Sequence, residues 1–278
     1  MTMDRRQIRR AFGQAVESYD RVAVLQQRIG ENLLQRLDLL KINPKRVLDL
    51  GCGTGVCLRA LEKRYPGAQV LGLDFALAMA QRAGTRTWRR RRPVVAADAE
   101  YLPFQDNTID LVISNLMLQW CDTTRVCYEI SRVLAPHGVC LLTTFATDTL
   151  KELRAAWQIA DPGQTHVSDF IDMHDLGDIL LQSGMLLPVV DADRYTLTYA
   201  ELGGLFADLK GLGAVNAAKE RRRGLSGKQR HQTLLQAYQE YRDSDGRLPA
   251  TFEVVFGHAW ATEISQNPAS VQVSVPEY

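Results

Sequence analysis

The sequence predicts an α/β fold in which a Rossmann-like, largely parallel sheet carries helices on both faces. Short apolar runs alternate with segments of helical periodicity, which is the pattern of repeated βα units. One run, residues 47–50, passes directly into the glycine-rich turn Gly51-Cys-Gly-Thr-Gly55, so a buried strand would end at a turn that opens a helix. Apolar residues make up 46% of the 278 residues, which is enough for an ordinary globular core. We therefore expect any ligand to lie at the carboxyl ends of the strands.

The elements follow from the periodicity in chain order. Helices are expected over residues 4–40, where apolar residues recur at steps of three and four. Five strand-like runs come next, at residues 47–50, 70–74, 94–97, 109–114 and 139–145. Two further helices and two further strands are expected at residues 148–160, 174–184, 186–199 and 251–260. Seven strands in total would form the sheet.

The expected domain organisation is a single core with helical additions. A polar, helical stretch separates the last two strands, and we interpret it as a lid inserted into the core. The N-terminal helices would cover the site, and the C-terminal residues without periodicity would form a flexible tail. In residue numbers, the N-terminal segment is 1–40, the core 41–199 with 247–265, the lid 200–246 and the tail 266–278.

Charge and cysteine content exclude several classes of function. The net charge is +1, so no overall field would recruit nucleic acid. The five cysteines contain no Cys-x-x-Cys pair and are odd in number, which argues against a disulfide framework or a zinc site. No apolar run approaches the roughly 20 residues of a membrane span, and no signal peptide is expected. We therefore expect a cytoplasmic protein with no metal and no membrane or nucleic-acid partner.

The glycine turn predicts a cofactor site. Asp74 ends the second strand-like run, 21 residues after Gly53, where a carboxylate can bind the two ribose hydroxyls of a nucleotide-like cofactor. The spacing Gly-x-Gly-x-Gly resembles the first motif of class I S-adenosylmethionine (SAM) methyltransferases. In such a site the glycines admit the methionine part of SAM, the helix N-terminus favours its carboxylate, and Asp49 accepts from its ammonium. A lone glycine turn can also be a simple strand-to-helix connection. The residues expected at this end are Asp49, Gly51, Cys52, Gly53, Gly55, Asp74 and Phe75.

Two later strand ends extend the predicted site. Asp98 and Ala99 follow the third strand, where Asp98 could accept from an adenine amino group and the Ala99 backbone could face the ring. Alternatively, Asp98 is a turn residue or a helix cap. The end of the fourth strand would face the transferred methyl and the cofactor. Three polar or amphipathic residues lie there, Asn115, Gln119 and Trp120. The apolar residues between them are equally compatible with the core.

Two basic clusters have two interpretations each. The first is residues 88–92, and the second is residues 219–223 with Lys228 and Arg230. A solvated loop or helix face is the simpler interpretation. The alternative is a docking surface for an acidic partner.

Several segments together resemble one family. Ser114-Asn-Leu-Met-Leu-Gln-Trp-Cys121 and Leu209-Lys-Gly-Leu-Gly-Ala214 are the most selective, and residues 11–20, 129–138, 143–145 and 252–260 add to them. They resemble the malonyl-acyl-carrier-protein O-methyltransferases of biotin synthesis. The resemblance spans nearly the whole chain and implies a class I methyltransferase sheet with SAM as cofactor.

The resemblance also implies a reaction and its site. The enzyme would methylate the free carboxylate of malonyl-acyl carrier protein, giving the methyl ester that primes pimeloyl synthesis. A carboxylate is already an anion at pH 7, so no general base is needed, and alignment can supply on the order of 7–11 kcal/mol. His166 and His258 are accordingly expected to be structural. The substrate-positioning candidates are Tyr19, Asn115, Gln119, Trp120, Arg132, Phe145 and Lys210, with Arg132 the first choice to pair with the carboxylate. The acidic carrier would dock on Arg221, Arg222, Arg223 and Lys228.

Two other functions stay open at this point. The same core could methylate a small molecule such as a quinone precursor, or it could bind SAM without turnover as an assembly factor. Only methyl transfer separates these alternatives, because all of them include SAM binding.

Overall fold

The computed structural model describes residues 4–84, 92–214 and 227–262. Within these ranges seven strands form one sheet in the order β3-β2-β1-β4-β5-β7-β6. Their bounds are β1 (Arg46–Leu50), β2 (Gln69–Asp74), β3 (Val94–Ala96), β4 (Ile109–Asn115), β5 (Leu134–Phe145), β6 (Leu186–Tyr199) and β7 (Leu248–Trp260). The first five strands are parallel to one another, and β7 lies antiparallel between β5 and β6. The predicted α/β class is confirmed, with the strand order reversing beside β1, where open sheets bind ligands.

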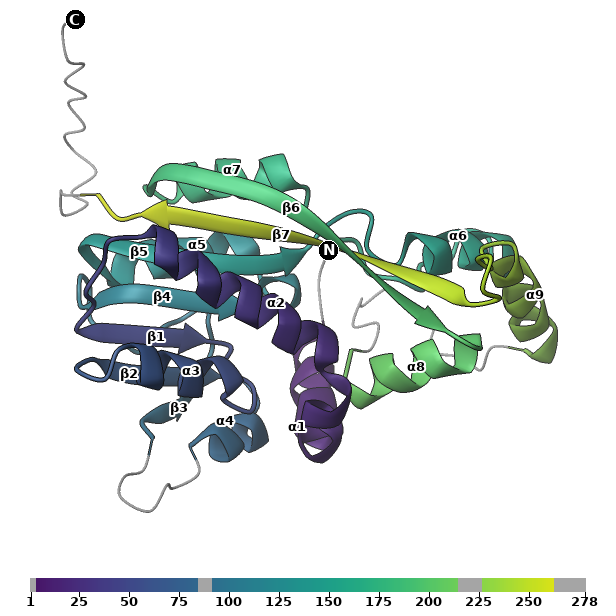
Figure 1. The fold of residues 1–278 in the computed structure, drawn as a ribbon, viewed down its shortest axis with the longest axis horizontal. Helices are drawn as coiled ribbons and strands as arrows, with labels where there is room; N and C mark the ends of the chain where they lie inside the picture. Colours follow the sequence, from purple (N-terminus) through teal and green to yellow (C-terminus); the bar gives the residue numbers. More distant parts are fainter. Residues whose placement is uncertain (1–3, 85–91, 215–226, 263–278) are drawn as a thin grey trace, which may run out of the picture.

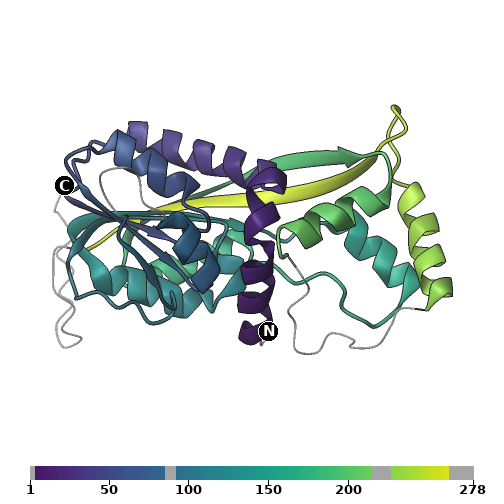
Figure 2. The same cartoon turned by 90° about the horizontal axis from the view of Figure 1, so that it is seen from below.

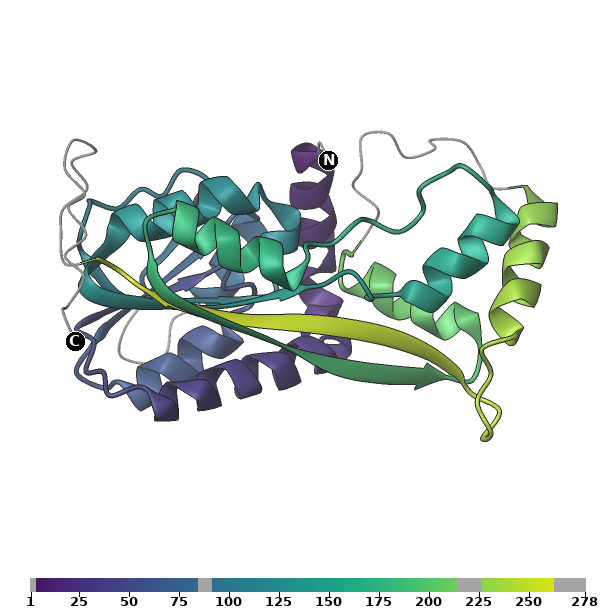
Figure 3. The same ribbon diagram turned by 90° about the horizontal axis from the view of Figure 1, so that it is seen from above.

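Helices cover both faces of the sheet. Their bounds are α1 (Arg5–Val22), α2 (Val24–Gln35), α3 (Val56–Arg64), α4 (Leu77–Ala83), α5 (Thr123–Val133), α6 (Lys151–Ala160), α7 (Met173–Gln182), α8 (Leu202–Gly211) and α9 (Lys228–Gln239), with short 3-10 turns η1 (Arg36–Leu39) and η2 (Leu118–Trp120). Helices α2 and α3 pack on one face, and α5 and α7 on the other (Figure 3). Helix α1 begins after Asp4, whose side chain accepts from the Gln7 N–H and so caps the first turn.

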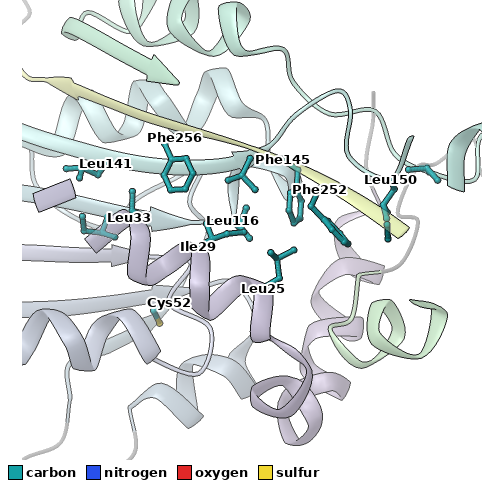
Figure 4. Close-up of a cluster of buried hydrophobic side chains, with 14 of the residues drawn as sticks. Leu25, Ile29, Leu33, Cys52, Leu116, Leu141, Phe145, Leu150, Phe252 and Phe256 are labelled. Carbon is teal, nitrogen blue, oxygen red and sulfur yellow. The ribbon is translucent and has the colours of Figure 1, made fainter. Parts of the chain in front are cut away.

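Strand alternation divides the core into two layers. Val47 faces the cluster that includes Leu25, Ile29 and Leu33 of α2, whereas Leu48 and Leu50 face the cluster under α5 and α7. Figure 4 shows the first layer, with the α2 leucines against the sheet. Asp49 has the same parity as Val47, so its carboxylate is carried into the apolar layer beneath α2.

The last two strands extend well beyond the others. β6 and β7 form a long antiparallel pair whose outer end carries α6, α8 and α9 (Figure 1). Helix α1 stands between this outer group and the rest of the sheet (Figure 2), and it contacts α4 and α8. The Ser18 hydroxyl donates to the Gly211 carbonyl at 3.1 Å, which fixes α1 against the end of α8.

Two structural features are absent from the described ranges. No helix there has both the length and the apolar character needed to cross a bilayer. Nor does any cluster of three or more His, Cys, Asp or Glu side chains in these ranges have an arrangement that could hold a metal ion.

Candidate functional site

The glycine turn after β1 has a backbone that only glycine adopts easily. Gly51, Gly53 and Gly55 have φ values of +76°, +53° and +84°, in the left-handed region. The N–H groups of Gly51 and Cys52 both donate to the Leu73 carbonyl, at 2.8 and 2.9 Å, which ties the turn to the end of β2. A Cβ at Gly51 would lie 2.4 Å from Cγ of Met117, so the turn also packs closely against the segment after β4.

Two carboxylates lie at this turn, one buried and one partly buried. Asp49 is 1% exposed, and its Oδ2 has no hydrogen-bond partner in the described ranges. Burial, together with the charge of Asp74, raises the pKa of Asp49 to about 7. Asp74 accepts from the N–H groups of Gly53 at 2.9 Å and Ala76 at 2.8 Å, yet burial raises its pKa to about 6. A cationic donor would satisfy the unpartnered Asp49 oxygen and favour the ionised pair.

A cavity lies over these strand ends, and we call it the strand-end cavity. It has about 740 Å³ of empty space, which includes the part open to solvent. The predicted site residues that line it are Tyr19, Gly51, Gly53, Asp74, Phe75, Asp98, Ala99, Asn115 and Trp120. A smaller recess of about 460 Å³ shares Tyr19, Gly51 and Asn115 with it and adds Asp49 and Cys52. Gly55 lines neither space, since it begins α3 as its N-cap.

The N-terminal helix closes the strand-end cavity through a residue that the sequence prediction missed. Arg5 forms ion pairs with Asp98 and with Glu100, the latter at 2.6 Å, and its guanidinium lies 5.1 Å from the Phe75 ring centroid. The other Asp98 oxygen accepts from the Glu100 N–H at 3.0 Å. Asp98 is therefore a turn residue, as the alternative interpretation had it, and its carboxylate meets Arg5 at the cavity wall. Its contact with adenine stays a prediction.

Tyr19 and Asn115 lie beside the glycine turn. Burial raises the pKa of Tyr19 well above its ordinary value, so the phenol stays neutral and can donate a hydrogen bond. The Asn115 amide donates to the Gln26 carbonyl at 2.9 Å, and its oxygen accepts from the Thr143 hydroxyl at 2.9 Å. Asn115 thus joins α2, β4 and β5 at the cavity floor.

Trp120 lies on the wall between the strand-end cavity and a second space, which we call the outer chamber. Its ring meets Phe12 of α1 edge to face, with centroids 5.3 Å apart. The outer chamber has about 600 Å³ of empty space, and Gln119, Trp120 and Phe145 are among its walls. Gln119 and Phe145 therefore face this second space rather than the strand-end cavity.

Arg132, our first choice to pair with a substrate carboxylate, lies elsewhere. Its guanidinium donates to Glu129, Asp106 and the carbonyls of Leu102 and Phe104, and it lines neither cavity. The reason is topological: α5 runs antiparallel to the strands, so its last turn lies beside the start of β4, where the Asn107 N–H donates to the Arg132 carbonyl. The prediction for Arg132 is therefore corrected to a structural role.

The other basic candidates are either exposed or outside the described residues. Lys210 is exposed near the end of α8, while its neighbour Leu209 lines the outer chamber. Lys228 is exposed at the start of α9. Arg221, Arg222, Arg223 and residues 88–91 of the first basic run lie outside the described residues.

Sequence reasoning also missed a cation beside the end of β5. Arg154 on α6 donates to the carbonyls of Thr147 at 2.8 Å, Ser168 at 3.2 Å and Thr149 at 3.4 Å. In the described part of the chain it forms no ion pair with a carboxylate, and its Nε is buried without a partner. Thr149 and Ser168 line the outer chamber, so Arg154 places an uncompensated positive charge behind its wall. The signal in the sequence that could have identified Arg154 is an arginine that follows a predicted strand end.

Comparison with known proteins gives a consistent family. Residues 48–142 match the family described as a methyltransferase domain. A malonyl-acyl-carrier-protein O-methyltransferase of Halorhodospira halophila is 46% identical over 93% of this chain and 88% of its own length. The protein of the same name from Gallionella capsiferriformans is 43% identical over 97% and 96% of the two chains. The solved YcgJ protein of Bacillus subtilis shares the fold, with a TM-score of 0.58 at 17% identity over 84% of this chain and 99% of that one. The chain therefore belongs to the malonyl-acyl-carrier-protein O-methyltransferase family.

Proposed function

We propose that this protein transfers a methyl group from SAM to the free carboxylate of malonyl-acyl carrier protein, giving the methyl ester that primes pimeloyl synthesis for biotin. The observation that carries the proposal is the 46% identity over 93% of the chain to a relative of that name. The buried, unpartnered Asp49 oxygen beside a left-handed glycine turn adds independent support for the donor half of the reaction.

The residues of the strand-end cavity and of the adjoining recess suit SAM. Asp49 would accept from the ammonium, the N-terminus of α3 would face the carboxylate, and Asp74 would bind the ribose hydroxyls. Phe75, Asp98 and Ala99 would border the adenine, with Arg5 holding α1 across it. When bound, SAM supplies an electrophilic methyl group on a sulfonium.

The acceptor needs alignment and exclusion of water rather than a base. The malonyl carboxylate is ionised at pH 7, so it attacks without proton removal. Tyr19 and Trp120 would orient it from the wall of the strand-end cavity, and the Tyr19 hydroxyl would donate to it. Among the described residues, Arg154 is the cation best placed to balance its charge, because its guanidinium has no acidic partner there.

Carrier docking belongs to the same proposal. An acidic acyl carrier protein would meet Lys228 at the start of α9 together with Arg221, Arg222 and Arg223. Methyl transfer from the carrier substrate should then weaken with added salt, since the attraction of exposed charges is screened over about 10 Å at 0.1 M ionic strength. Turnover that is indifferent to salt would assign these side chains to solvent only.

The deciding experiment is intact-mass spectrometry of carrier proteins incubated with the purified protein and SAM. Malonyl-acyl carrier protein should gain one methyl group, and acetyl-acyl carrier protein, which lacks the free carboxylate, should gain none. No methyl on either carrier, with SAM still bound, would overturn the proposal and leave a small-molecule acceptor or a non-catalytic assembly role.

A further inference from the structure

The outer chamber is apolar and directly adjoins the strand-end cavity. Trp120 lines both spaces. Phe145 packs against Phe170 and Phe252, with ring centroids 5.8 and 5.7 Å apart, and all three rings line the chamber. Figure 4 shows Phe145, Phe252 and Leu150 gathered at the outer end of the core layer. A ligand that reaches the transferred methyl through this space must therefore be slender and mostly apolar.

Four polar side chains interrupt this largely apolar lining: Gln119, Thr149, His166 and Ser168. His166 is the only ionisable side chain among the described residues that line the outer chamber. Its ring stacks on Trp157 at a centroid distance of 3.7 Å and an interplanar angle of 8°. Its Nε2 lies 2.9 Å from Oδ2 of the buried Asp161, so two independent contacts fix the orientation of the imidazole.

The Asp161 contact defines what His166 can offer. An ionised carboxylate only accepts, so Nε2 carries the proton and donates to it. In the neutral ring Nδ1 is then an acceptor, and it has no hydrogen-bond partner in the described part of the chain. A fixed acceptor beside an apolar space suits a ligand that brings an N–H group.

The same cluster reaches the surface helix α9. Arg230 of α9 pairs with the other Asp161 oxygen, with Nε and Oδ1 3.1 Å apart. Lys228 lies two residues earlier at the start of that helix, on the surface where we place the carrier protein. The outer chamber thus lies between the docking helix and the strand-end cavity, and a substrate tethered to a carrier on α9 would cross it.

We propose that the outer chamber binds the thioester arm of the acyl carrier protein, and that His166 Nδ1 accepts a hydrogen bond from an amide N–H of that arm. This inference rests on the proposed function. An arm of this kind is slender, flexible and largely apolar, with isolated amide groups, and it matches a chamber of largely apolar walls that carries the fixed acceptor of His166. Trp120 then marks the point where the malonyl end passes to the methyl donor.

A matched pair of tryptophan substitutions on α6 tests the location. Leu153 lines the chamber and is 3% exposed, whereas Ile159 on the same helix is 62% exposed. Leu153→Trp should raise KM for malonyl-acyl carrier protein by at least about tenfold, because the added volume fills the space needed by the arm. Ile159→Trp should leave KM unchanged. Malonyl methyl thioester, which has no arm, should react equally well with wild type and Ile159→Trp, and the dissociation constant of SAM should not change in any of them.

A second variant tests the histidine and remains informative if Leu153→Trp fails to fold. His166→Phe keeps the stack on Trp157, removes the Nδ1 acceptor and also removes the Nε2 hydrogen bond to Asp161. It should raise KM for malonyl-acyl carrier protein up to about tenfold, and this rise should be larger than any change in KM for malonyl methyl thioester. Equal rises for the carrier and the armless thioester would indicate a structural role and overturn the assignment.

The outcomes separate the two proposals. Wild-type protein that methylates neither substrate would remove the proposed function and this inference with it. Wild-type methylation together with an unchanged KM in both Leu153→Trp and His166→Phe would overturn the arm site alone.

Discussion

Lowering the pH from 7 to 5 should weaken binding of SAM to the protein, because a proton must leave Asp49 before its carboxylate can meet the ligand ammonium. Asp49 is 1% exposed, and burial beside Asp74 raises its pKa to about 7. The unpartnered Oδ2 can accept from the ammonium, which would hold the carboxyl ionised in the complex. The ligand amine has an ordinary pKa near 7.7–8.0 and stays mostly charged over this range.

The size of the effect follows from the ionised fraction of Asp49 in the free protein. With a pKa of about 7, this fraction falls from about one half at pH 7 to about one hundredth at pH 5, so the dissociation constant should rise about 50-fold. A pKa of about 6 would still give about tenfold. The sign is fixed: a raised carboxyl pKa means that binding of a cation releases a proton and is favoured by higher pH. Asp74, with its pKa raised to about 6, titrates in the same window and steepens the dependence.

Isothermal titration calorimetry at pH 5, 6 and 7 measures the dissociation constant of SAM. Two buffers of different ionisation enthalpy count the proton that is released on binding. The control ligand is 5′-methylthioadenosine, which keeps the ribose and adenine but has no ammonium, and it should show only the weaker dependence due to Asp74. Asp49→Asn should bind SAM more weakly at pH 7 and lose most of the dependence. The reasoning would be refuted if the wild-type constants at pH 5 and pH 7 agreed within about threefold, or if both ligands responded equally.

Three further substitutions have expected outcomes. Gly51→Ala places a Cβ 2.4 Å from Met117 at a φ of +76°. It should lower the free energy of unfolding by about 1–3 kcal/mol and abolish SAM binding. Denaturant titration and calorimetry that match wild type would contradict this expectation. Arg132→Ala removes hydrogen bonds to two acids and two carbonyls. Urea titration should therefore show a free energy of unfolding lower by about 2–4 kcal/mol, with KM for malonyl-acyl carrier protein unchanged. A selective rise in KM would restore its substrate role. Arg154→Gln should raise that KM by about tenfold or more while SAM affinity stays the same, and Arg154→Lys should recover part of it; normal kinetics in Arg154→Gln would exclude it as the carboxylate partner.

The cofactor end of the site could be predicted from sequence because its signals are local. The apolar run before Gly51, the left-handed turn that demands glycine, and the acid at the end of the next strand all lie within one βαβ unit. Asp49 illustrates the same point, since its place on β1 fixes the face that it occupies. The pairing of Arg5 with Asp98 is different: 93 residues separate them, and no periodicity in either segment reports the contact.

The substrate end was harder because it depends on direction as well as on element type. Arg132 sits on a correctly predicted helix, yet it was assigned to the wrong end of the sheet. A helix that follows a strand returns toward the amino ends of the strands, so residues in its last turn move away from the site, whereas residues just after a strand stay beside it. Arg154 follows β5 closely enough to remain near the carboxyl ends. Applying the direction of the crossover to each basic candidate would have favoured Arg154 over Arg132.

Trp120 shows what chain topology adds to a local motif. The sequence places it after β4, and a single amphipathic ring there is compatible with a cavity wall or with the core. Its position between two cavities arises because α1 supplies Phe12 on one side, while β5, β7 and the segment that contains His166 enclose the other. Those walls come from segments that are far apart in the chain and meet only when β7 inserts antiparallel beside β5. A partition of this kind is a property of the complete sheet and of its long outer β6–β7 pair, and for that reason the division of the site into a donor space and an outer chamber emerges only from the fold.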